Sequence, residues 1–356
     1  MRSFTKHLFL ALSLAAGFFS LIIAPAIHAQ SDTPYYQGKT IRILVSSGAG
    51  GGTDAAARLV SRFIAKYIPG NPKVIVQNMP GGAGTNANNY FANEAKPDGL
   101  TLLQDASSGV MNFMRGGSTV KYDPRKFVMI GGVSRPGTLL MIRNDARARF
   151  ANRSAKPVVV GDTDGIRTWI AMTVWGAEYL GWNLRWIYGY PGSRELQLAI
   201  RQGEIDMWST QNAKLVKDLQ SEGVVQIVCT EEDRRREDFP EVPTFAELLG
   251  AKKPTGVAWQ AYNGWAGAPE LDKYVVAPEG TPDHLIKILR EAFSKLMKDP
   301  EVDKEGDKFF GDGWKPQSPE RIEAVVNEQI AIPKEAKDFI TKMRQKYGLP
   351  TAEKQS

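Results

Sequence analysis

Short apolar runs alternate with amphipathic segments along most of this chain, and this alternation limits the fold more than any other feature. The run at 40–45 is followed at 55–68 by apolar residues that recur every three or four positions, which is the spacing of a helix. A second helical segment at 86–95 lies between two further apolar runs, at 73–78 and 100–104. Strands that alternate with helices form parallel sheets covered on both faces, so we expect an α/β fold.

The alternation restarts near residue 157 and predicts a second set of strands and helices. Its strands are expected at 157–160, 184–190, 204–209 and 224–230. Two similar sets indicate two lobes with a cleft between them, and the segment from Tyr274 onward would return to the first lobe. We therefore expect a first lobe at 30–137 plus 257–356 and a second lobe at 138–256.

The N-terminal 29 residues have the pattern of a secretory signal peptide. Arg2 and Lys6 precede a charge-free apolar stretch at 8–27, and small residues ending at Ala29 offer a cleavage site. The stretch is also long enough to be an uncleaved membrane anchor, which is the alternative interpretation. We expect cleavage near Ala29 and a periplasmic mature protein.

Histidine and cysteine are too scarce for several classes of enzyme. Only His284 lies after the predicted signal peptide, and Cys229 is the single cysteine. The chain contains no H-E-x-x-H motif, no zinc-ligand spacing and no G-x-S-x-G motif. We therefore expect no enzyme activity, no metal and no cofactor, and we interpret Cys229 as a buried thiol in an apolar strand.

Charge gives no sign of a nucleic-acid partner. The chain has 45 Lys and Arg residues against 39 Asp and Glu residues, a mild excess that is spread along its length. The densest basic run, at 234–236, is flanked by acidic residues within the charged connector 231–243. Mixed charges of this kind are typical of a solvated loop, so we place the connector on the surface.

A glycine-rich loop follows the first predicted strand, with Gly48 and three consecutive glycines at 50–52. The dinucleotide pattern G-x-G-x-x-G fails because Thr53 occupies its last position, and a P-loop would need a lysine before Thr53. The N–H groups at a helix N-terminus can instead hold a carboxylate where glycines allow close approach. Asp54 is interpreted as a cap of the helix.

A second loop of the same type, at 161–167, opens the second predicted lobe. Asp162 and Asp164 would repel an anion unless they form turns or cap the helix, or unless Arg167 offsets their charge. The turn at Tyr190 is a third position where a strand leads into a helix.

Several short motifs occur in the order found in one family of binding proteins. They lie at 39–43, 51–54, 78–84, 97–103, 190–193, 203–207, 240–244 and 277–282. Each motif is short, but their order is specific and spans about residues 35–330. On these motifs the chain resembles the receptor proteins of tripartite tricarboxylate transporters, the Bug family of extracytoplasmic solute-binding proteins.

This resemblance implies a two-lobed periplasmic-binding-protein fold, the "Venus flytrap", with a small carboxylate ligand between the lobes. It also implies a monomer whose partner is a membrane permease of the tripartite type. The ligand would lie against Ser46, Ser47, Ala49, Gly50, Gly51, Gly52, Thr53 and Asp54 in the first loop and against Asp162, Thr163, Asp164, Gly165 and Arg167 in the second. Further cleft positions would be Ser107, Ser108, Tyr190, Gln211 and Asn212.

The chain departs from the family pattern in both loops. Ser46 and Ser47 stand where the family usually has prolines, and Asp162 and Asp164 replace small neutral residues. The second lobe is also rich in tryptophan, at 169, 175, 182, 186 and 208. A core position is the expectation for each, and one near the cleft would favour a ligand with a ring.

Three alternatives to a transport receptor remain open from the sequence. One is an exported enzyme in which Asp162 and Asp164 act as acid and base. Another is a binder in which the same pair holds Ca²⁺ that bridges to an acid ligand. The third is an orphan ligand sensor without a permease.

Overall fold

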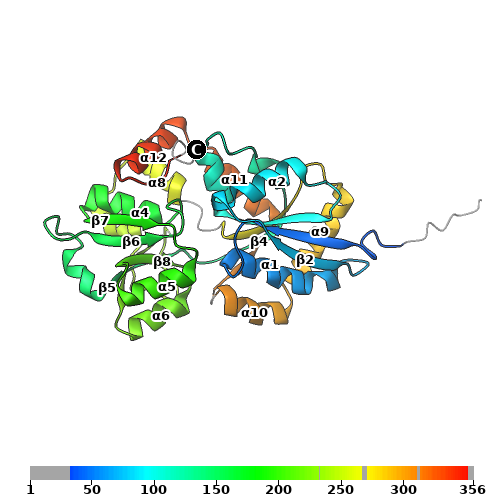
Figure 1. Cartoon of the computed structure of the whole chain (residues 1–356), viewed down its shortest axis with the longest axis horizontal. Helices are drawn as coiled ribbons and strands as arrows, with labels where there is room; N and C mark the ends of the chain where they lie inside the picture. The colour runs from blue at the N-terminus through cyan, green and yellow to red at the C-terminus, as the bar shows by residue number, and fades with distance from the viewer. Residues whose placement is uncertain (1–32, 232, 267–270, 311–312, 352–356) are drawn as a thin grey trace, which may run out of the picture. The chain divides into compact units, whose positions relative to one another are not determined.

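Two mixed β-sheets organise the chain, and both lie in the compact unit that begins at Tyr35 (Figure 1). The computed structural model describes residues 33–231, 233–266, 271–310 and 313–351. The predicted signal peptide and its cleavage site near Ala29 lie outside these residues. Within the described ranges, the helices are too short or too polar to cross a membrane.

The first sheet has the strand order β11-β4-β10-β3-β1-β2. Its strands are β1 (Thr40–Val45), β2 (Lys73–Asn78), β3 (Thr101–Ala106), β4 (Val128–Ser134), β10 (Lys273–Ala277) and β11 (Lys315–Gln317). Strands β1, β2 and β3 are parallel, as the alternation predicts, but β10 runs antiparallel to both β3 and β4. The sheet is therefore mixed and not purely parallel.

The second sheet has the order β7-β6-β8-β5-β9 and the same design. Its strands are β5 (Leu139–Arg143), β6 (Val158–Asp162), β7 (Leu184–Tyr188), β8 (Met207–Thr210) and β9 (Val225–Thr230). Strand β6 is parallel to β7 and β8, whereas β5 runs antiparallel to β8 and β9. Each sheet thus contains an inner strand that runs against its neighbours.

Helices cover both faces of the first sheet because its strands are apolar on both sides. Ile41, Ile43 and Val45 face one core and Leu44 the other, which is the period-two pattern of a buried strand. The first core is covered by α1 (Gly52–Phe63), α9 (Asp283–Leu296) and α10 (Pro300–Phe310). The opposite core is covered by α2 (Thr85–Glu94), α3 (Ser107–Arg115) and α11 (Pro319–Ile330).

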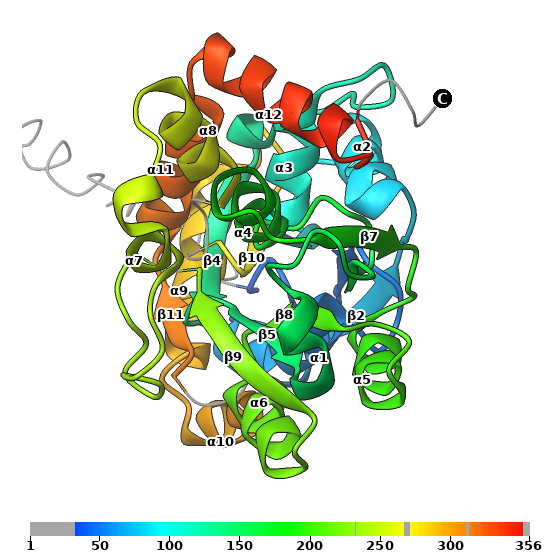
Figure 2. The same ribbon diagram turned by 90° about the vertical axis from the view of Figure 1, so that its left-hand side faces the viewer.

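The second sheet packs into one large core with its own helices (Figure 2). These are α4 (Ile170–Trp175), α5 (Ser193–Gln202), α6 (Ala213–Ser221), α7 (Phe245–Leu249), α8 (Val257–Ala266) and α12 (Lys334–Lys346). The remaining turns are the 3-10 helices η1 (Ile64–Tyr67), η2 (Gly82–Gly84), η3 (Pro124–Lys126), η4 (Asn144–Arg149) and η6 (Gly250–Lys252), and the π-helix η5 (Gly176–Leu180).

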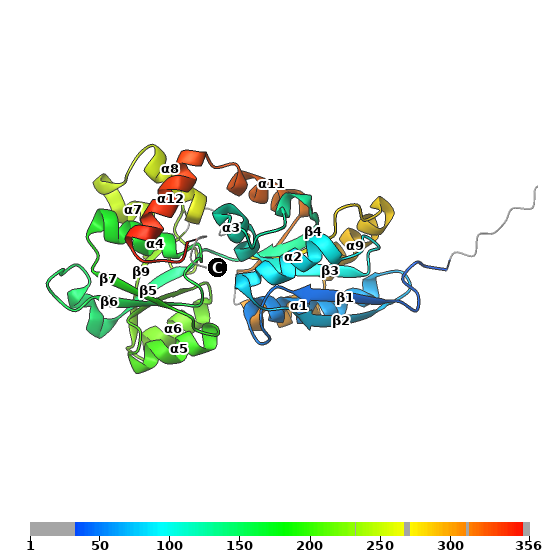
Figure 3. The ribbon, with the colours of Figure 1, turned by 45° about the horizontal axis from the view of Figure 1, so that its top comes forward.

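Helices α8 and α12 pack in a different lobe from the one that the predicted boundaries give them. Both fall in the range expected for the first lobe, yet their buried residues belong to the core of the second sheet. Figure 3 shows the two helices next to α4 of the second lobe. The reason is aromatic packing. The centre of a Trp175 ring lies 6.1 Å from that of Trp265 in α8 and 5.9 Å from that of Phe339 in α12. The chain therefore returns to the second sheet after α11.

The sequence predicted that the connector at 231–243 lies on the surface, but part of it is buried. The Arg236 side chain is buried, and its Nη1 donates a hydrogen bond to the Gly137 carbonyl at 2.7 Å. Its guanidinium also forms a bidentate pair with Asp238. Because Gly137 lies between β4 and β5, this buried arginine fixes the segment that joins the two sheets.

Trp175→Ala should lower the free energy of unfolding of the second lobe by about 3–5 kcal/mol, because it removes a fully buried ring that joins α4 to α8 and α12. Urea unfolding followed by circular dichroism measures the change. Leu198→Ala, at an exposed position on α5, is the control and should stay within about 0.5 kcal/mol. Equal effects of the two substitutions would contradict this account of the core.

Candidate functional site

The glycine-rich loop leaves the first turn of α1 without a side-chain cap. Gly51 is the residue before the helix, and as a glycine it makes no side-chain capping hydrogen bond. A Cβ atom at Gly48 or Gly50 would meet nothing within 4 Å, so the loop borders open space. The N–H groups at this helix end are therefore available to an anion.

Asp54 holds the glycine-rich loop in shape instead of capping the helix. Its Oδ2 accepts hydrogen bonds from the Gly50 N–H and from Arg58 Nε, both at 2.9 Å. Its Oδ1 accepts one from Asn78 at 2.9 Å. Burial opposes the ionised form, but these donors outweigh it and lower the pKa of Asp54. The carboxylate is thus engaged within the loop.

A second uncapped helix begins beside the first. Helix α3 starts at Ser107 and Ser108, both half-buried, and Ala106 before it offers no side-chain cap. Strands β1 and β3 are parallel neighbours, so their carboxyl ends and the helices that follow meet at one edge of the sheet. Ligands bind at such edges in open α/β sheets.

A buried carboxyl group that the sequence did not single out lies near the end of β3, beside Ser46. Asp105 is fully buried at the end of β3, and its Oδ2 accepts a hydrogen bond from the Tyr274 hydroxyl at 3.2 Å. Burial raises the pKa of Asp105, while hydrogen bonds from Ser46 and Asn88 oppose that shift. Ser46 is therefore buried and bonded to Asp105, although the resemblance placed it against the ligand.

Three charged residues join this edge: Lys273 and Asp272 at the start of β10, and Arg135 just after β4. Lys273, the first residue of β10, pairs with Ala106 at the end of β3. The Asp272 carboxylate accepts hydrogen bonds from Lys273 Nζ at 2.5 Å and from Arg135 at 2.5 and 3.0 Å. Burial opposes ionisation of Asp272, but the two cations outweigh it and hold its pKa well below the usual range.

Lys273 also lies against the glycine-rich loop. A Cβ atom at Gly52 would stand 3.7 Å from Lys273 Cε, so the ammonium end of this side chain adjoins the first turn of α1. Burial lowers the pKa of Lys273, although Asp272 partly restores it. No motif marks this lysine in the sequence, because only the pairing of β10 brings it to the site.

The aspartates of the second loop form turns within the loop. Asp162 Oδ2 accepts a hydrogen bond from the Gly165 N–H at 2.7 Å, and Asp164 Oδ1 accepts one from the Ile166 N–H at 3.0 Å. This is the turn-forming role that the sequence left open. Burial raises the pKa of Asp162 to about 7, and the neighbouring Asp164 carboxylate adds to the shift.

Arginines from separate elements surround these aspartates. Arg167 Nε lies 3.5 Å from Asp164 and 3.3 Å from the Thr163 hydroxyl. Partial burial lowers the pKa of Arg167, yet Asp164, Asp162 and Asp272 raise it overall. Asp272 precedes β10 of the first sheet. Its electrostatic interaction with Arg167 therefore links the second loop to the cluster of Arg135, Asp272 and Lys273. The Asp164 carboxylate also acts on Arg115 and Arg344.

Arg344 fixes the second loop from α12. Its side chain is buried, and Nη2 donates a hydrogen bond to the Gly165 carbonyl at 2.9 Å. The guanidinium also lies 4.7 Å from the centre of the Trp265 ring, a cation–π contact. Burial lowers the pKa of Arg344 to about 9, so it stays positively charged near neutral pH. Nothing in the sequence pattern pointed to Arg115 or Arg344.

Three other predicted positions have local partners. The Tyr190 hydroxyl donates to Glu204 at 2.5 Å, and its backbone N–H lies 3.4 Å from the Asp162 carbonyl. Asn212 caps α6 by accepting from the Leu215 N–H at 3.0 Å. The Gln211 carbonyl accepts from Arg236 at 3.3 Å. Their ligand-binding role stays a prediction, as it does for the loop residues.

The tryptophans of the second lobe lie in its core, which is where the sequence placed them by default. Trp169, Trp175, Trp182 and Trp208 are buried, and the Trp186 indole donates to the Thr173 hydroxyl at 2.8 Å. Cys229 is buried as predicted, and burial raises the pKa of its thiol. In the described ranges, no set of three or more His, Cys, Asp or Glu side chains is placed to hold a metal ion.

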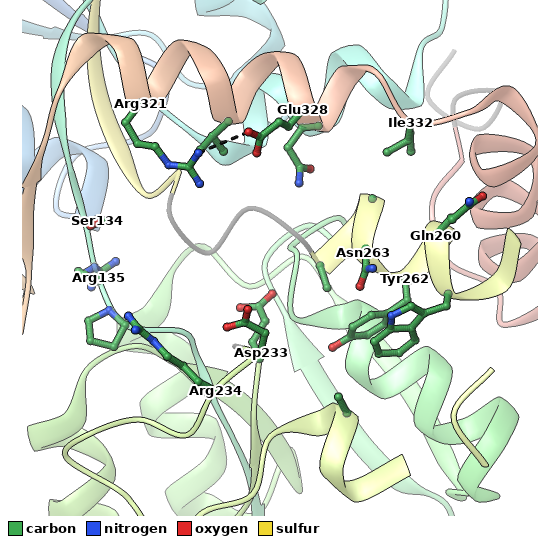
Figure 4. A pocket seen from close by; sticks show the side chains of 18 of the residues that line it. Ser134, Arg135, Asp233, Arg234, Gln260, Tyr262, Asn263, Arg321, Glu328 and Ile332 are labelled. Carbon is green, nitrogen blue, oxygen red and sulfur yellow. Dashed lines mark hydrogen bonds and ion pairs between the residues drawn. The ribbon is translucent and has the colours of Figure 1, made fainter. Parts of the chain in front are cut away.

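A separate cavity of about 1050 Å³ lies between the segment that follows β4, helix α8 and helix α11 (Figure 4). Arg135, Tyr262 and Arg321 are among the residues that line it. None of the positions predicted for the ligand contributes to this cavity. It is therefore distinct from the two glycine-containing loops.

Comparison with known proteins supports the same fold and the same resemblance. No family model matches the chain. A UPF0065 protein of Bordetella bronchiseptica is 26% identical over 296 residues, which cover 80% of this chain and 82% of that protein. A UPF0065 protein of Agrobacterium vitis is 27% identical over 289 residues, 79% of this chain and 77% of that protein.

Solved structures of periplasmic binding proteins superpose on most of the chain. A TctC solute-binding protein from Polaromonas has a TM-score of 0.62 at 21% identity, with 86% of this chain and 99% of that chain covered. The periplasmic binding protein BugD has a TM-score of 0.62 at 20% identity, covering 88% and 99%. An R. palustris protein solved with adipate has a TM-score of 0.64 at 19% identity, covering 87% and 97%.

These likenesses agree with the motifs from which the family was predicted. The chain is therefore similar in sequence to the UPF0065 proteins and shares the two-lobed fold of the TctC and Bug periplasmic binding proteins, which confirms the resemblance.

Proposed function

We propose that the protein is a periplasmic receptor that captures a small organic carboxylate between its two lobes. It then presents the acid to a membrane permease of the tripartite tricarboxylate type. The observation that carries this proposal is the edge of the first sheet, where the uncapped N-terminus of α1 adjoins the Lys273 side chain. The uncapped N-terminus of α3 follows Ala106, which pairs with Lys273. Helix N-termini and a buried cation together favour an anionic group.

The charges around the second loop support an anionic ligand as well. Asp164 interacts electrostatically with three positive side chains, those of Arg115, Arg167 and Arg344, and Asp162 interacts with the last two. The aspartates that the sequence suggested would repel an acid are therefore outnumbered by cations. A solved structure of the same fold contains adipate, a dicarboxylate, which makes this class the first to test.

An enzyme that uses Asp162 and Asp164 has less support. A general acid or base must come within hydrogen-bonding distance of the substrate. Asp162 is 3% exposed, and its Oδ2 is already held by the Gly165 N–H. Turnover of a bound acid that is lost in Asp162→Asn would favour the enzyme instead.

Titration calorimetry of the mature protein with adipate, citrate, benzoate and neutral adipamide tests the receptor function. We expect a carboxylate to bind and to be recovered unchanged, while adipamide binds more weakly. Thermal unfolding adds a second readout, since a ligand at 100 times its Kd stabilises the folded state by about 2.7 kcal/mol. Absence of binding by every acid would overturn the proposal.

The glycine-rich loop should tolerate a side chain at one glycine and not at another. Gly50 has a φ of +83°, a left-handed conformation that strains any residue with a Cβ, whereas Gly48 has no such φ and open space around it. Gly50→Ala should weaken acid binding about tenfold, because strain of about 1–2 kcal/mol displaces the loop. Gly48→Ala is the matched control and should bind like the wild type in calorimetry.

Acid binding should strengthen as the pH falls from 8 to 6. The pKa of Asp162 is raised to about 7, so lower pH protonates this carboxyl and removes a negative charge beside the ligand. If only the protonated form binds well, the Kd falls by up to about tenfold over this range. Adipate carries negative charge throughout this range, and the flanking Arg115, Arg167 and Arg344 are expected to keep their charge.

Asp162→Asn tests this assignment because it imitates the protonated carboxyl. Its Kd for adipate should be low and nearly constant between pH 6 and pH 8. Asp145→Asn, at an ion pair on the second lobe, should retain the pH dependence of the wild type. A slope that persists in Asp162→Asn would place the titrating group elsewhere.

A further inference from the structure

Lys273 is a positively charged residue that reaches the first turn of α1 from a distant strand, β10. A Cβ atom at Gly52 would meet a single neighbour within 4 Å, the Lys273 Cε atom at 3.7 Å. The lysine side chain is 8% exposed, so its ammonium group is largely shielded from water. A shielded charge interacts more strongly with an anion than a charge at the open surface does.

We propose that Lys273 makes the binding site select an ionised acid over its neutral analogue, by donating a charge-assisted hydrogen bond to the acid group that lies at the first turn of α1. This inference rests on the proposed function and assigns one residue within it. The lysine is a specificity residue, and the glycine-rich loop supplies the neutral backbone donors.

The stem of Lys273 is held by the apolar core, and its ammonium group lies beside Asp272, with Cε next to Gly52 of the loop. Ala56 and Val60 of α1, Val275 of β10 and Phe293 of α9 line the same small cavity as this side chain. Val275 is two residues along the strand and lies in the core covered by α1. Successive side chains alternate across a strand, so Lys273 points to the face on which α1 begins.

Asp272 does not cancel the charge of Lys273 completely, because it is shared. Arg135 holds both oxygens of the Asp272 carboxylate, whereas Lys273 Nζ donates to one of them, Oδ1, and to the Asp272 backbone carbonyl. The cluster of Arg135, Asp272 and Lys273 therefore carries a net positive charge. If Lys273 turns to a ligand, Asp272 keeps its bidentate partner, so no buried carboxylate is left unpaired.

Lys273→Met is the direct test, because methionine preserves an apolar stem of similar length and removes the charge. In calorimetry, wild-type protein should bind adipate more tightly than its monoamide and adipamide. Hydrogen bonds to charged groups contribute enough that Lys273→Met should weaken adipate binding about ten- to hundredfold. Binding of the neutral amides should change little, and Lys273→Arg should retain a preference for the acid.

Lys214→Met serves as the matched control, since this lysine is exposed on α6 of the second lobe. It should leave both acid and amide binding unchanged. If the Lys273→Met variant prefers acid over amide to the same degree as the wild type, the inference is overturned. Absence of acid binding in the wild type itself would instead overturn the proposed function, so the two failures are distinguishable.

A ligand-free test covers the case in which Lys273→Met fails to fold. Gly52→Glu places a carboxylate where the acid group is expected, and Gly52→Gln places a neutral group of the same size there. We expect Gly52→Glu to melt at a higher temperature than Gly52→Gln, with the difference shrinking in 1 M NaCl. In a Lys273→Gln background the two should melt more nearly alike, apart from the contribution of the helix N-terminus.

Equal melting temperatures of Gly52→Glu and Gly52→Gln would overturn the inference without any ligand. A difference of the same size in the Lys273→Gln background would also overturn it, because the helix N-terminus alone would then account for the effect.

Discussion

The reversed strand in each sheet is the constraint on which the rest of the structure depends. Strand β10 runs against β3 and β4, so it begins at the edge where those strands end, and Lys273 therefore lies beside Ala106. Strand β5 does the same in the second sheet, since Leu139 pairs with Thr210 at the end of β8. Both strands begin next to helix N-termini. The reversal thus brings charged side chains to the edges where parallel strands present only backbone and loops.

The second loop contains two aspartates, yet hydrogen bonds and nearby arginines make it compatible with an anion site. Asp162 and Asp164 accept hydrogen bonds from their own loop, so much of their capacity as acceptors is used internally. Arg115 comes from α3, Arg167 from the loop and Arg344 from α12, and all three respond to the Asp164 charge. The loop therefore contributes a local balance of charge and not a simple negative patch.

The sequence alone predicted the parts of the fold that depend on local patterns. Strands β1 to β3 and their helices follow from apolar spacing, and the loop at Gly50 to Gly52 follows from glycine chemistry. The positions of Lys273, Arg115 and Arg344 could not be predicted in this way, because each reaches the site through strand pairing or helix packing between distant segments. The return of α8 and α12 to the second core was missed for the same reason, since aromatic contacts decide it.

The distribution of aromatic residues explains why charge and backbone groups are left to recognise the ligand. Trp175 and Trp265 pack against each other in the second core, and the Trp265 indole donates to the Arg167 carbonyl at 3.1 Å. Both rings are fully buried, and the hydrogen bond from Trp265 ties the second loop to α8. A site with few aromatic walls distinguishes ligands by hydrogen bonds and charge more than by hydrophobic shape. In the receptor proposed above, selection between acid and amide is assigned to a buried cation, Lys273, at the start of α1.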